Sequence, residues 1–551
     1  MSPRSLALRS LSVLSVALLV AAGCKSVGGA VGGSSASGTA DLVEAPPPGA
    51  DAWTPAQRGG FYALYGDFGN LSTDNLRSVA LPWKLVGVLA DLVPEPFFSQ
   101  GQHEWVARFE EPLRRFGVVY GTRVAQPVGM KAQSDFRGVP VGFARGVVER
   151  GGVMLELASA NCSLCHAGRS WDAQGNPTRE VIWGVPNHSV DLDGLRAAVA
   201  AALLDARATD ALVMAALQRK YPNLAPQERE TYQRLVLPVL REQAQAARGR
   251  GGRALPWSFG GPGMHNGSAL SRSALTGAQG EGDFSASYVK TPSLFGALLK
   301  RRSLADGSLQ AVDAEATADV ALAQRLVGYL PRVGTPPARA AAEGEHLAQL
   351  TAFLDELQPP RFPGPVDAAA AERGHALYGR RCAGCHGDKG SDGRYQYPDR
   401  LFSVAAVGTD ATRAQATTEA DAATLAASEA GKVAQLSPTG GYQPPPLLGV
   451  WAAAPYLHNG SVPTLWHLLT PAERPTRFYV GGHKLDLERV GIAGQPGPDG
   501  LWDVPEGYVS WSEPKLVDTR EPGRSNRGHE KQVEGLSERE RRDVIEYLKT
   551  L

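Results

Sequence analysis

The sequence predicts a mainly α-helical protein built from two domains with long loops. Apolar positions recur at helical spacing in residues 340–357, 368–381 and 535–551, whereas the alternation of apolar and polar residues that marks strands is sparse. A proline-rich joint, QPPRFPGPVD at 358–367, divides the chain. We therefore expect one domain on each side of this joint.

The individual elements follow from local patterns. Residues 191–221 are rich in Ala and Leu and are predicted to be helical. The Ala-rich residues 368–381 place a helix directly before a cysteine motif. The last helix has Ser537 as its N-cap and Glu540 to complete a capping box. The Ala- and Thr-rich residues 405–434 are interpreted as a surface excursion within the second domain.

Composition limits the class of protein. With 551 residues, 43% hydrophobic and 20% charged side chains, the chain is long enough for two or three domains with ordinary cores. Lys plus Arg and Asp plus Glu both total 56, so the formal charge is zero. No global field favours nucleic acid, anionic lipid or an acidic partner, and we expect no nucleic-acid partner.

The first residues have the features of an export signal. Arg4 and Arg9 precede an apolar stretch at 11–22 that is too short to span a bilayer comfortably. The stretch ends in Ala-Ala-Gly-Cys, which resembles a bacterial lipobox whose Cys24 is acylated after cleavage. We predict a lipoprotein signal peptide at 1–24; the alternative is a secretory signal followed by a chance cysteine.

A flexible tether is predicted to follow the signal. Residues 25–52 are rich in Gly, Ser, Ala and Pro and cannot build a core. No later segment is apolar and long enough to span a membrane. We expect the rest of the chain to be soluble in the periplasm or at the cell surface, attached to the membrane through its lipid.

The four remaining cysteines form two copies of C-x-x-C-H, in NCSLCHAG and RCAGCHGD. In c-type attachment both thiols bond to the haem vinyl groups and the adjacent histidine binds the iron, so all three residues must share one short helical turn. A thioredoxin-like dithiol lacks the obligatory histidine, and a structural zinc needs two more ligands near each pair. Two copies in an exported chain also argue against buried structural pairs. We predict two covalently bound haem c groups, at Cys162, Cys165 and His166 and at Cys382, Cys385 and His386.

The sixth position of each iron decides between electron transfer and chemistry. The last methionine is Met264, so no methionine of the second domain can close the second haem. The histidines on offer are His458, His467, His483 and His529. His467 lies in the apolar run TLWHLLT and fits a packed core, whereas the loops around His458 and His529 contain Gly and Asn and suit close approach to a haem. Our hypothesis is that His529 is the ligand.

The sixth position of the first haem stays open at this point. Its downstream candidates are His188, Met214, Met264 and His265. Met214 lies on the predicted Ala-rich helix, where core packing is the usual role. The Gly-rich segment 255–270 offers Trp257, Phe259, Met264 or His265 to a haem face. A surface loop fits this segment equally well.

Four blocks carry a resemblance to a known family: VPVGFARGVVERGGVMLELASANCSLCHAG, RRCAGCHGDKG, PPLLGVWAAAPYLHNGSVPTLWHLLTPAERPTRFYVGG and NRGHEKQVEGLSERERRDVIEYLKTL. With them the chain resembles, from about Trp53 onward, the dihaem cytochrome c peroxidase superfamily, and within it the branch that includes the bacterial rubber oxygenases. This resemblance implies a mainly α fold of two cytochrome c-like domains facing one another, at 53–360 and 361–551.

The family also implies a division of labour between the haems. One haem is kept open for peroxide or dioxygen, and the other is closed by two protein ligands. In the rubber-oxygenase branch the N-terminal haem is the open one and the C-terminal haem has two histidine ligands. The GHE histidine corresponds to His529, and the His458 position lies beside the haem without binding it.

The chain departs from the family at two places. The family commonly carries a Trp before Asp-Gly between the haems, but here Ala305 precedes Asp306 and Gly307, which puts fast electron transfer between the haems in doubt. The aromatic pocket residues of the oxygenases have no clear match between Phe284 and Val320, so polyisoprene cleavage is not carried over.

These features favour a redox enzyme that acts on peroxide or dioxygen at the N-terminal haem and takes electrons from a redox partner protein or a small donor. The alternative is a non-enzymatic dihaem electron-transfer protein with both irons closed. A lipoprotein that uses haem only as a structural core is a third interpretation. Resemblance of fold alone does not decide among them.

Overall fold

A computed structural model describes residues 49–68, 71, 80–94, 105–107, 111, 113–124, 140–150, 153–249, 258–276 and 286–551. The predicted signal peptide, the lipidation site Cys24 and most of the predicted tether lie outside the described residues. So do Trp257 and Phe284.

The prediction of a mainly α fold is wrong. The structure is 43% helical and 16% strand, and its strands form many small sheets. Most strands have two to four residues, too few for alternating polarity to be recognised in the sequence. The longer strands are β5 (Phe143–Arg150), β6 (Val153–Ala160), β7 (Ala167–Trp171) and β8 (Pro177–Trp183).

Some short strands pair with a neighbouring segment, and others connect loops that are distant in the sequence. The orders β1-β6-β5, β4-β8-β7, β11-β12-β16 and β21-β22-β18-β23 describe the sheets of three or four strands, and the remaining strands pair in twos. The short strands are β1 (Ala80–Leu81), β2 (Leu92–Pro94), β3 (Trp105–Ala107), β4 (Arg123–Val124), β9 (Met264–His265), β10 (Val289–Lys290), β11 (Arg302–Ser303), β12 (Leu309–Ala311), β13 (Asp388–Lys389), β14 (Tyr395–Gln396), β15 (Phe402–Ser403), β16 (Ala434–Leu436), β17 (Gly441–Tyr442), β18 (Arg477–Val480), β19 (Leu485–Asp486), β20 (Gly491–Ile492), β21 (Gln495–Pro496), β22 (Leu501–Asp503) and β23 (Lys515–Asp518).

The α-helices are distributed over both halves of the chain. Before the proline-rich joint they are α2 (Pro55–Tyr65), α3 (Trp83–Asp91), α4 (Cys162–His166), α5 (Leu192–Leu204), α6 (Asp210–Lys220), α7 (Pro226–Thr231), α8 (Leu237–Gly249), α9 (Gly267–Thr276), α10 (Ala318–Tyr329), α11 (Pro337–Ala342) and α12 (Gly344–Glu356). After it they are α13 (Ala368–Arg381), α14 (Ala383–His386), α15 (Val404–Val407), α16 (Glu419–Ala426), α17 (Leu465–Leu469), α18 (Glu530–Val533) and α19 (Glu538–Leu548).

The helix predictions made from local patterns are confirmed. Helices α5 and α6 cover the Ala- and Leu-rich stretch, α13 precedes the second motif, and α19 has the predicted capping box between Ser537 and Glu540. The helix predicted at 340–357 is divided into α11 and α12 at Glu343.

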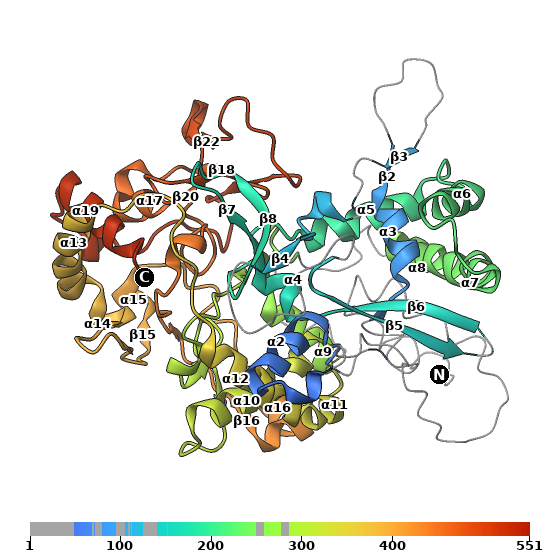
Figure 1. Cartoon of the computed structure of the whole chain (residues 1–551), viewed down its shortest axis with the longest axis horizontal. Helices are drawn as coiled ribbons and strands as arrows, with labels where there is room; N and C mark the ends of the chain where they lie inside the picture. Colours follow the sequence, from blue (N-terminus) through green and yellow to red (C-terminus); the bar gives the residue numbers. More distant parts are fainter. Residues whose placement is uncertain are drawn as a thin grey trace.

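Two helix crossings, one in each half, organise the fold. Helix α2 packs across α12, and α13 packs across α19 at the edge of the molecule (Figure 1). A methyl group on Gly59 would overlap the backbone carbonyl of Gln349, and one on Gly374 would overlap that of Asp543. Each crossing therefore depends on a glycine that lets the two backbones approach closely.

One apolar core runs through both halves. It contains Trp183, Phe295 and Phe353 from the first half and Trp451 and Phe478 from the second. A separate apolar cluster lies among α3, α5, α6 and α8, on the right of Figure 1. The two halves are thus packed against each other rather than strung on a linker.

The interpretation of residues 405–434 as a surface excursion is right for only part of the segment, because most of it is exposed or half-buried but some residues pack into the interior. Arg413 and Thr417 are buried, and Arg413 forms a salt bridge with Asp306 of the first half at 2.9 Å. Strand β16 extends β12 of the first half. Small Ala and Thr side chains here allow close packing between the halves.

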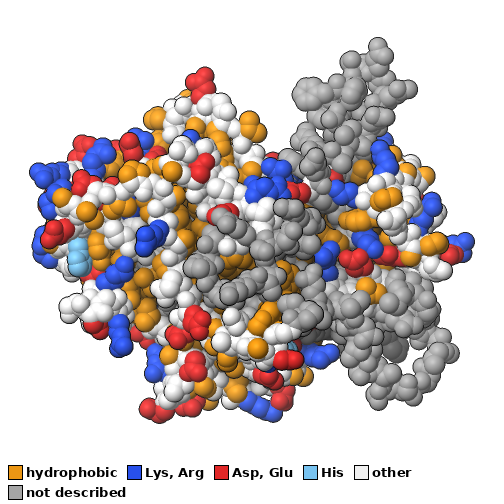
Figure 2. All heavy atoms as spheres, in the orientation of Figure 1, with side chains coloured by type: hydrophobic (Ala, Val, Ile, Leu, Met, Phe, Trp, Pro, Cys, Tyr) orange, Lys and Arg blue, Asp and Glu red, His pale blue; other side chains and the backbone are white. Residues whose placement is uncertain are grey.

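The surface agrees with the balanced composition. On the face drawn in Figure 2, basic and acidic side chains of the described residues are intermingled. Within the described part of the chain, no helix combines the length and hydropathy needed to cross a membrane.

Candidate haem centres

The second C-x-x-C-H motif follows directly from helix α13. The backbone N–H of Cys382 bonds the carbonyl of Tyr378, and the N–H of His386 bonds that of Cys382 at 3.0 Å. Cys382, Cys385 and His386 therefore share one turn, as c-type attachment requires. Neither cysteine forms a disulfide, so both thiols are available to bond haem vinyl groups.

His386 is oriented by a backbone carbonyl. Its Nδ1 lies 2.8 Å from the carbonyl oxygen of Pro445. If Nδ1 carries the proton and donates it there, Nε2 keeps a free lone pair for a metal. Burial lowers the pKa of His386, which favours the neutral ring that metal binding needs.

His529 faces His386. Their ring centroids are 6.1 Å apart and their planes are inclined by only 18°. An iron between the rings, at about 2 Å from one nitrogen of each, requires a separation of about this size. The donor set and spacing therefore fit a haem iron held between the two imidazoles.

The backbone around His529 is unusual. His529 has a left-handed φ of 70°, and Gly528 before it has φ 136°. The N–H of His529 bonds the carbonyl of Val407 at 3.0 Å. Burial, together with the neighbouring His386, lowers the pKa of His529 to about 3, so its ring is neutral at physiological pH.

The other histidines considered for the second haem lie elsewhere. His467 is buried and bonded to Thr464, which confirms its predicted core role. Nε2 of His458 lies 3.0 Å from the hydroxyl of Tyr442. His483 is buried, with its ring 5.7 Å from that of His188.

The first motif lies between two strands. Asn161 caps helix α4 by accepting a bond from the N–H of Ser163, and its Nδ2 bonds the carbonyl of Leu64. This short helix brings Cys162, Cys165 and His166 onto one turn, and neither cysteine forms a disulfide.

His166 repeats the arrangement of His386 less tightly. Its ring is directed to the carbonyl of Pro292, although its Nδ1 lacks a hydrogen bond of standard geometry. Burial lowers the pKa of His166 to about 4. The ring is therefore neutral and suited to iron binding.

Three of the four candidates for the sixth position of the first haem are engaged elsewhere. Nε2 of His188 lies 2.9 Å from the carbonyl of Ala452. Met214 belongs to the apolar cluster around α6, which confirms its core role, and the sulfur of Met264 lies against Gly460.

His265 is the polar candidate close to the first motif. Burial, followed by the positive charge that His166 and Arg413 would carry, lowers the pKa of His265 to about 3. His265 lies in β9, which pairs with β10 just before Pro292.

An internal repeat at the haem-facing prolines was missed by the sequence analysis. Residues 291–307, TPSLFGALLKRRSLADG, match residues 444–460, PPPLLGVWAAAPYLHNG. Gly296 and Gly449 have φ of 71° and 66°, and each precedes a 3-10 helix, η7 (Ala297–Leu299) or η10 (Val450–Ala452). Leu304 and Leu457 also share a left-handed φ, of 69° and 64°. The recurring P-x-L-x-G spacing is the sequence signal that could have revealed this repeat. We call residues 291–307 the first proline loop and residues 444–460 the second proline loop.

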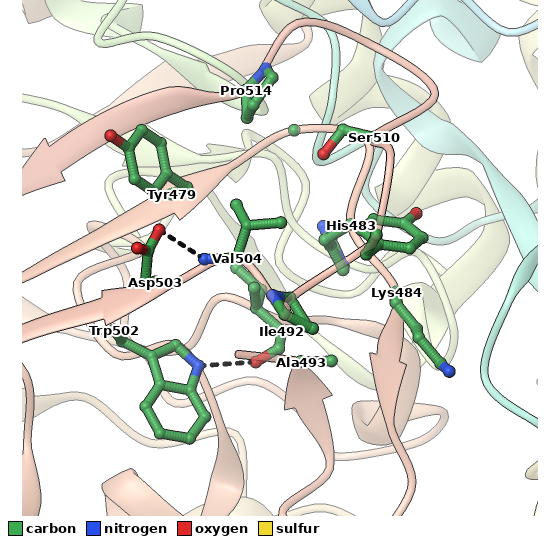
Figure 3. A pocket seen from close by; sticks show the side chains of 13 residues that line it. Tyr479, His483, Lys484, Ile492, Ala493, Trp502, Asp503, Val504, Ser510 and Pro514 are labelled. Atoms are coloured by element: carbon green, nitrogen blue, oxygen red, sulfur yellow. Dashed lines mark hydrogen bonds between the residues drawn. The ribbon is translucent and has the colours of Figure 1, made fainter. Parts of the chain in front are cut away.

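One pocket lies away from both C-x-x-C-H motifs. Its lining includes Tyr479, His483 and Trp502 (Figure 3). The indole N–H of Trp502 bonds the carbonyl of Ile492, so its polar group is already used. None of the predicted haem residues lines this pocket.

Comparison with known proteins finds a cytochrome c-like segment after the second motif. Residues 441–479, which include the second proline loop and His458, match the family described as RoxA-like, cytochrome c-like. Two similar curated proteins are the uncharacterized proteins y4iM and y4iJ of Sinorhizobium fredii (strain NBRC 101917 / NGR234). The first is 33% identical over 46% of this chain and 62% of its own length, the second 31% identical over 35% and 41%. The chain therefore spans less than two thirds of either relative. With its RoxA-like domain, the protein is a c-type cytochrome that binds haem c covalently.

Proposed function

We propose that the protein carries two haem c groups, one on each motif, and is a redox enzyme that acts on peroxide or dioxygen at the N-terminal haem. The facing rings of His386 and His529 carry this proposal. A haem with two imidazole ligands is suited to electron transfer, so the chemistry falls to the other haem.

Each residue has a defined part in this proposal. The thiols of Cys162 and Cys165 would attach the first haem and His166 would hold its iron. Cys382, Cys385 and His386 would do the same for the second haem, and His529 would be the second histidine to hold its iron. When bound, haem c supplies the redox chemistry. A partner protein or small molecule donates the electrons.

His265 has a separate part at the first haem. Its pKa of about 3 leaves the ring neutral at physiological pH, so a ring nitrogen could accept a hydrogen bond from the O–H of a peroxide substrate that reached this site. The same nearness to His166 favours the second candidate function, an electron carrier in which His265 closes the first iron.

The chain is further proposed to be an exported lipoprotein of the dihaem cytochrome c peroxidase superfamily, in the branch similar to rubber oxygenases, acylated at Cys24. The RoxA-like match at 441–479 supports the branch. Mature protein extracted from membranes should begin at an acylated Cys24, and a soluble product with an unmodified terminus would oppose the anchor.

Carbon monoxide distinguishes the enzyme from the carrier. Holoprotein should be made in a strain with working haem-ligation machinery, and its reduced spectrum recorded with and without the gas. If the protein is the proposed enzyme, one of its two haems should bind carbon monoxide. If the wild type binds no carbon monoxide and His265→Ala does bind it, His265 is an iron ligand and the protein is an electron carrier rather than the proposed enzyme. Turnover with peroxide and a reduced donor, or with dioxygen, then separates the two substrates.

A further inference from the structure

The two proline loops are joined by exchanged backbone hydrogen bonds. The N–H of Lys290, just before the first loop, donates to the carbonyl of His458 in the second at 2.8 Å. The N–H of Gln443, just before the second loop, donates to the carbonyl of Ala305 in the first at 3.0 Å. Since the loops carry the prolines that face His166 and His386, this contact is a direct junction between the two haem centres.

The side chain of Phe295, in the first proline loop, lies against Gly449 of the second. It is 2% exposed. A methyl group on Gly184 would lie 3.0 Å from its ring, and one on Gly449 would lie 2.7 Å from it. Both glycines have positive φ, of 96° and 66°. The ring therefore fills a space that only two glycines leave open.

Phe295 is linked to the first haem motif through one short hydrogen-bonded path. The N–H of Gly184 donates to the carbonyl of His166 itself at 2.7 Å, and the carbonyl of Gly184 accepts from the N–H of Leu294 at 2.8 Å. The peptide of His166 thus reaches the residue before Phe295 through two hydrogen bonds.

Through Gly449, Phe295 is also connected to the second haem motif. Gly449 lies four residues after Pro445, whose carbonyl accepts from Nδ1 of His386 at 2.8 Å. The neighbouring Leu448 and Pro446 also approach the position of Gly296, which is next to Phe295 in sequence. Covalent bonds, hydrogen bonds and one aromatic contact therefore connect His166 to His386.

We propose that Phe295 is the side chain that couples the two haem centres electronically. The inference rests on the proposed function, because it requires both haems. In each transfer one haem loses one electron and is oxidised while the other gains it and is reduced, and no proton or bond is exchanged. Phe295 acts here as a positioning and coupling residue and does not touch substrate.

A rival route runs through tryptophans. The rings of Trp171 and Trp451 are 6.2 Å apart, in a T-shaped arrangement. Trp451 belongs to the second proline loop, but Trp171 is at the far end of β7 from His166. The Phe295 route is favoured since it begins at the peptide of His166, and the tryptophans provide the comparison for the test.

Flash photoreduction of the holoprotein measures the coupling directly. A photoexcited ruthenium complex with a sacrificial donor delivers one electron to the oxidised protein. Its passage between the haems appears as opposite absorbance changes in their separate bands. This readout needs no substrate and works whether or not the first iron is open. Each variant must first be shown to hold two haems and to be fully folded at the temperature of the measurement.

Phe295→Leu is expected to slow or lose the transfer phase, and Trp451→Leu to retain it. Gly449→Ala should slow it as well, because its methyl group displaces the ring. Gly440→Ala is the matched control, because Gly440 has a similar φ of 61° and open space around it. An unchanged phase in Phe295→Leu, or a loss in Trp451→Leu alone, would overturn the proposal. Failure of the proposed function appears separately, as a wild-type protein with one haem or without carbon monoxide binding.

Discussion

Nη2 of Arg474 donates a 2.8 Å hydrogen bond to the carbonyl of Gly528, the residue directly before His529. Its Nη1 bonds Glu530, directly after His529, at 2.9 Å. The same guanidinium also bonds the carbonyls of His467, Leu468 and Asn526. Arg474 therefore fixes the loop on both sides of the proposed ligand.

Replacing Arg474 with Gln should loosen this loop. Loss of several hydrogen bonds from a buried cation costs about 3 kcal/mol of folding stability. We expect a fraction of the second haem to become high-spin and to bind carbon monoxide, measured by absorption spectroscopy. Arg477→Gln is the control, since the guanidinium of Arg477 makes only long contacts, of 3.5 Å to the carbonyls of Pro498 and Asp499 and 3.9 Å to the Asp499 carboxylate. A fully low-spin second haem in Arg474→Gln would show that the loop does not need this residue.

The crossing of α13 and α19 gives a matched pair of glycines. Gly374→Ala places a methyl group against the carbonyl of Asp543 and should cost about 1–3 kcal/mol. Gly379→Ala on the same helix meets open space and should stabilise the protein by about 0.5–1 kcal/mol. Urea unfolding of both holoproteins measures the difference. Equal stabilities would mean that the crossing is looser than described.

The buried pair of Asp306 and Arg413 joins the two halves. Asp306 is fully buried and accepts two bonds from Arg413 and one from Thr417. Asp306→Ala leaves the cation buried without its partner, which should cost about 3–5 kcal/mol. Thermal unfolding followed by circular dichroism checks this, with the exposed Asp313→Ala as control. Replacing both partners together, by Asp306→Leu and Arg413→Met, should restore much of the loss, and a double variant no better than the single one would contradict the account.

Buried histidines make stability depend on pH. Burial lowers the pKa of His467 to about 4, against an ordinary value of about 6.5. Below about pH 6.5 the unfolded chain binds a proton that the folded chain refuses, so stability falls as pH falls toward 4, by about 1.4 kcal/mol per unit for this group. Urea unfolding at about pH 7 and about pH 5 should give a smaller difference for His467→Gln than for wild type. An identical pH dependence would exclude His467 from the effect.

Local chemistry could be predicted from the sequence, and long-range pairing could not. The capping box of Ser537 and the turn of Cys382 to His386 depend on residues within a few positions of one another, and their placement agrees with the sequence analysis. The contact of Phe295 with Gly449 joins two segments that are far apart in the sequence, and their shared spacing does not predict that they touch. The short strands were missed because two to four residues are too few to show alternating polarity, and several of them pair with distant partners.

The residues of the candidate haem centres could likewise be predicted only in part from the sequence. His529 was preferred by resemblance, and the structure brings its ring opposite His386. Near the first motif, the sequence could not choose among His265, Met264 and His188. The structure favours His265, because His188 contacts Ala452 and Met264 contacts Gly460, and both of these partners lie in the other half of the chain. The similarity between residues 304–307 and 457–460 could be seen in the sequence. That the two segments also share a backbone conformation became clear only from the structure.

Intact mass of the purified mature protein tests the central claim most directly. The account predicts a polypeptide carrying two covalent haems, with one lost in a variant lacking both Cys162 and Cys165 and the other lost in a variant lacking both Cys382 and Cys385. A wild-type mass with a single haem, or a haem that remains after its own pair of cysteines is removed, would contradict it.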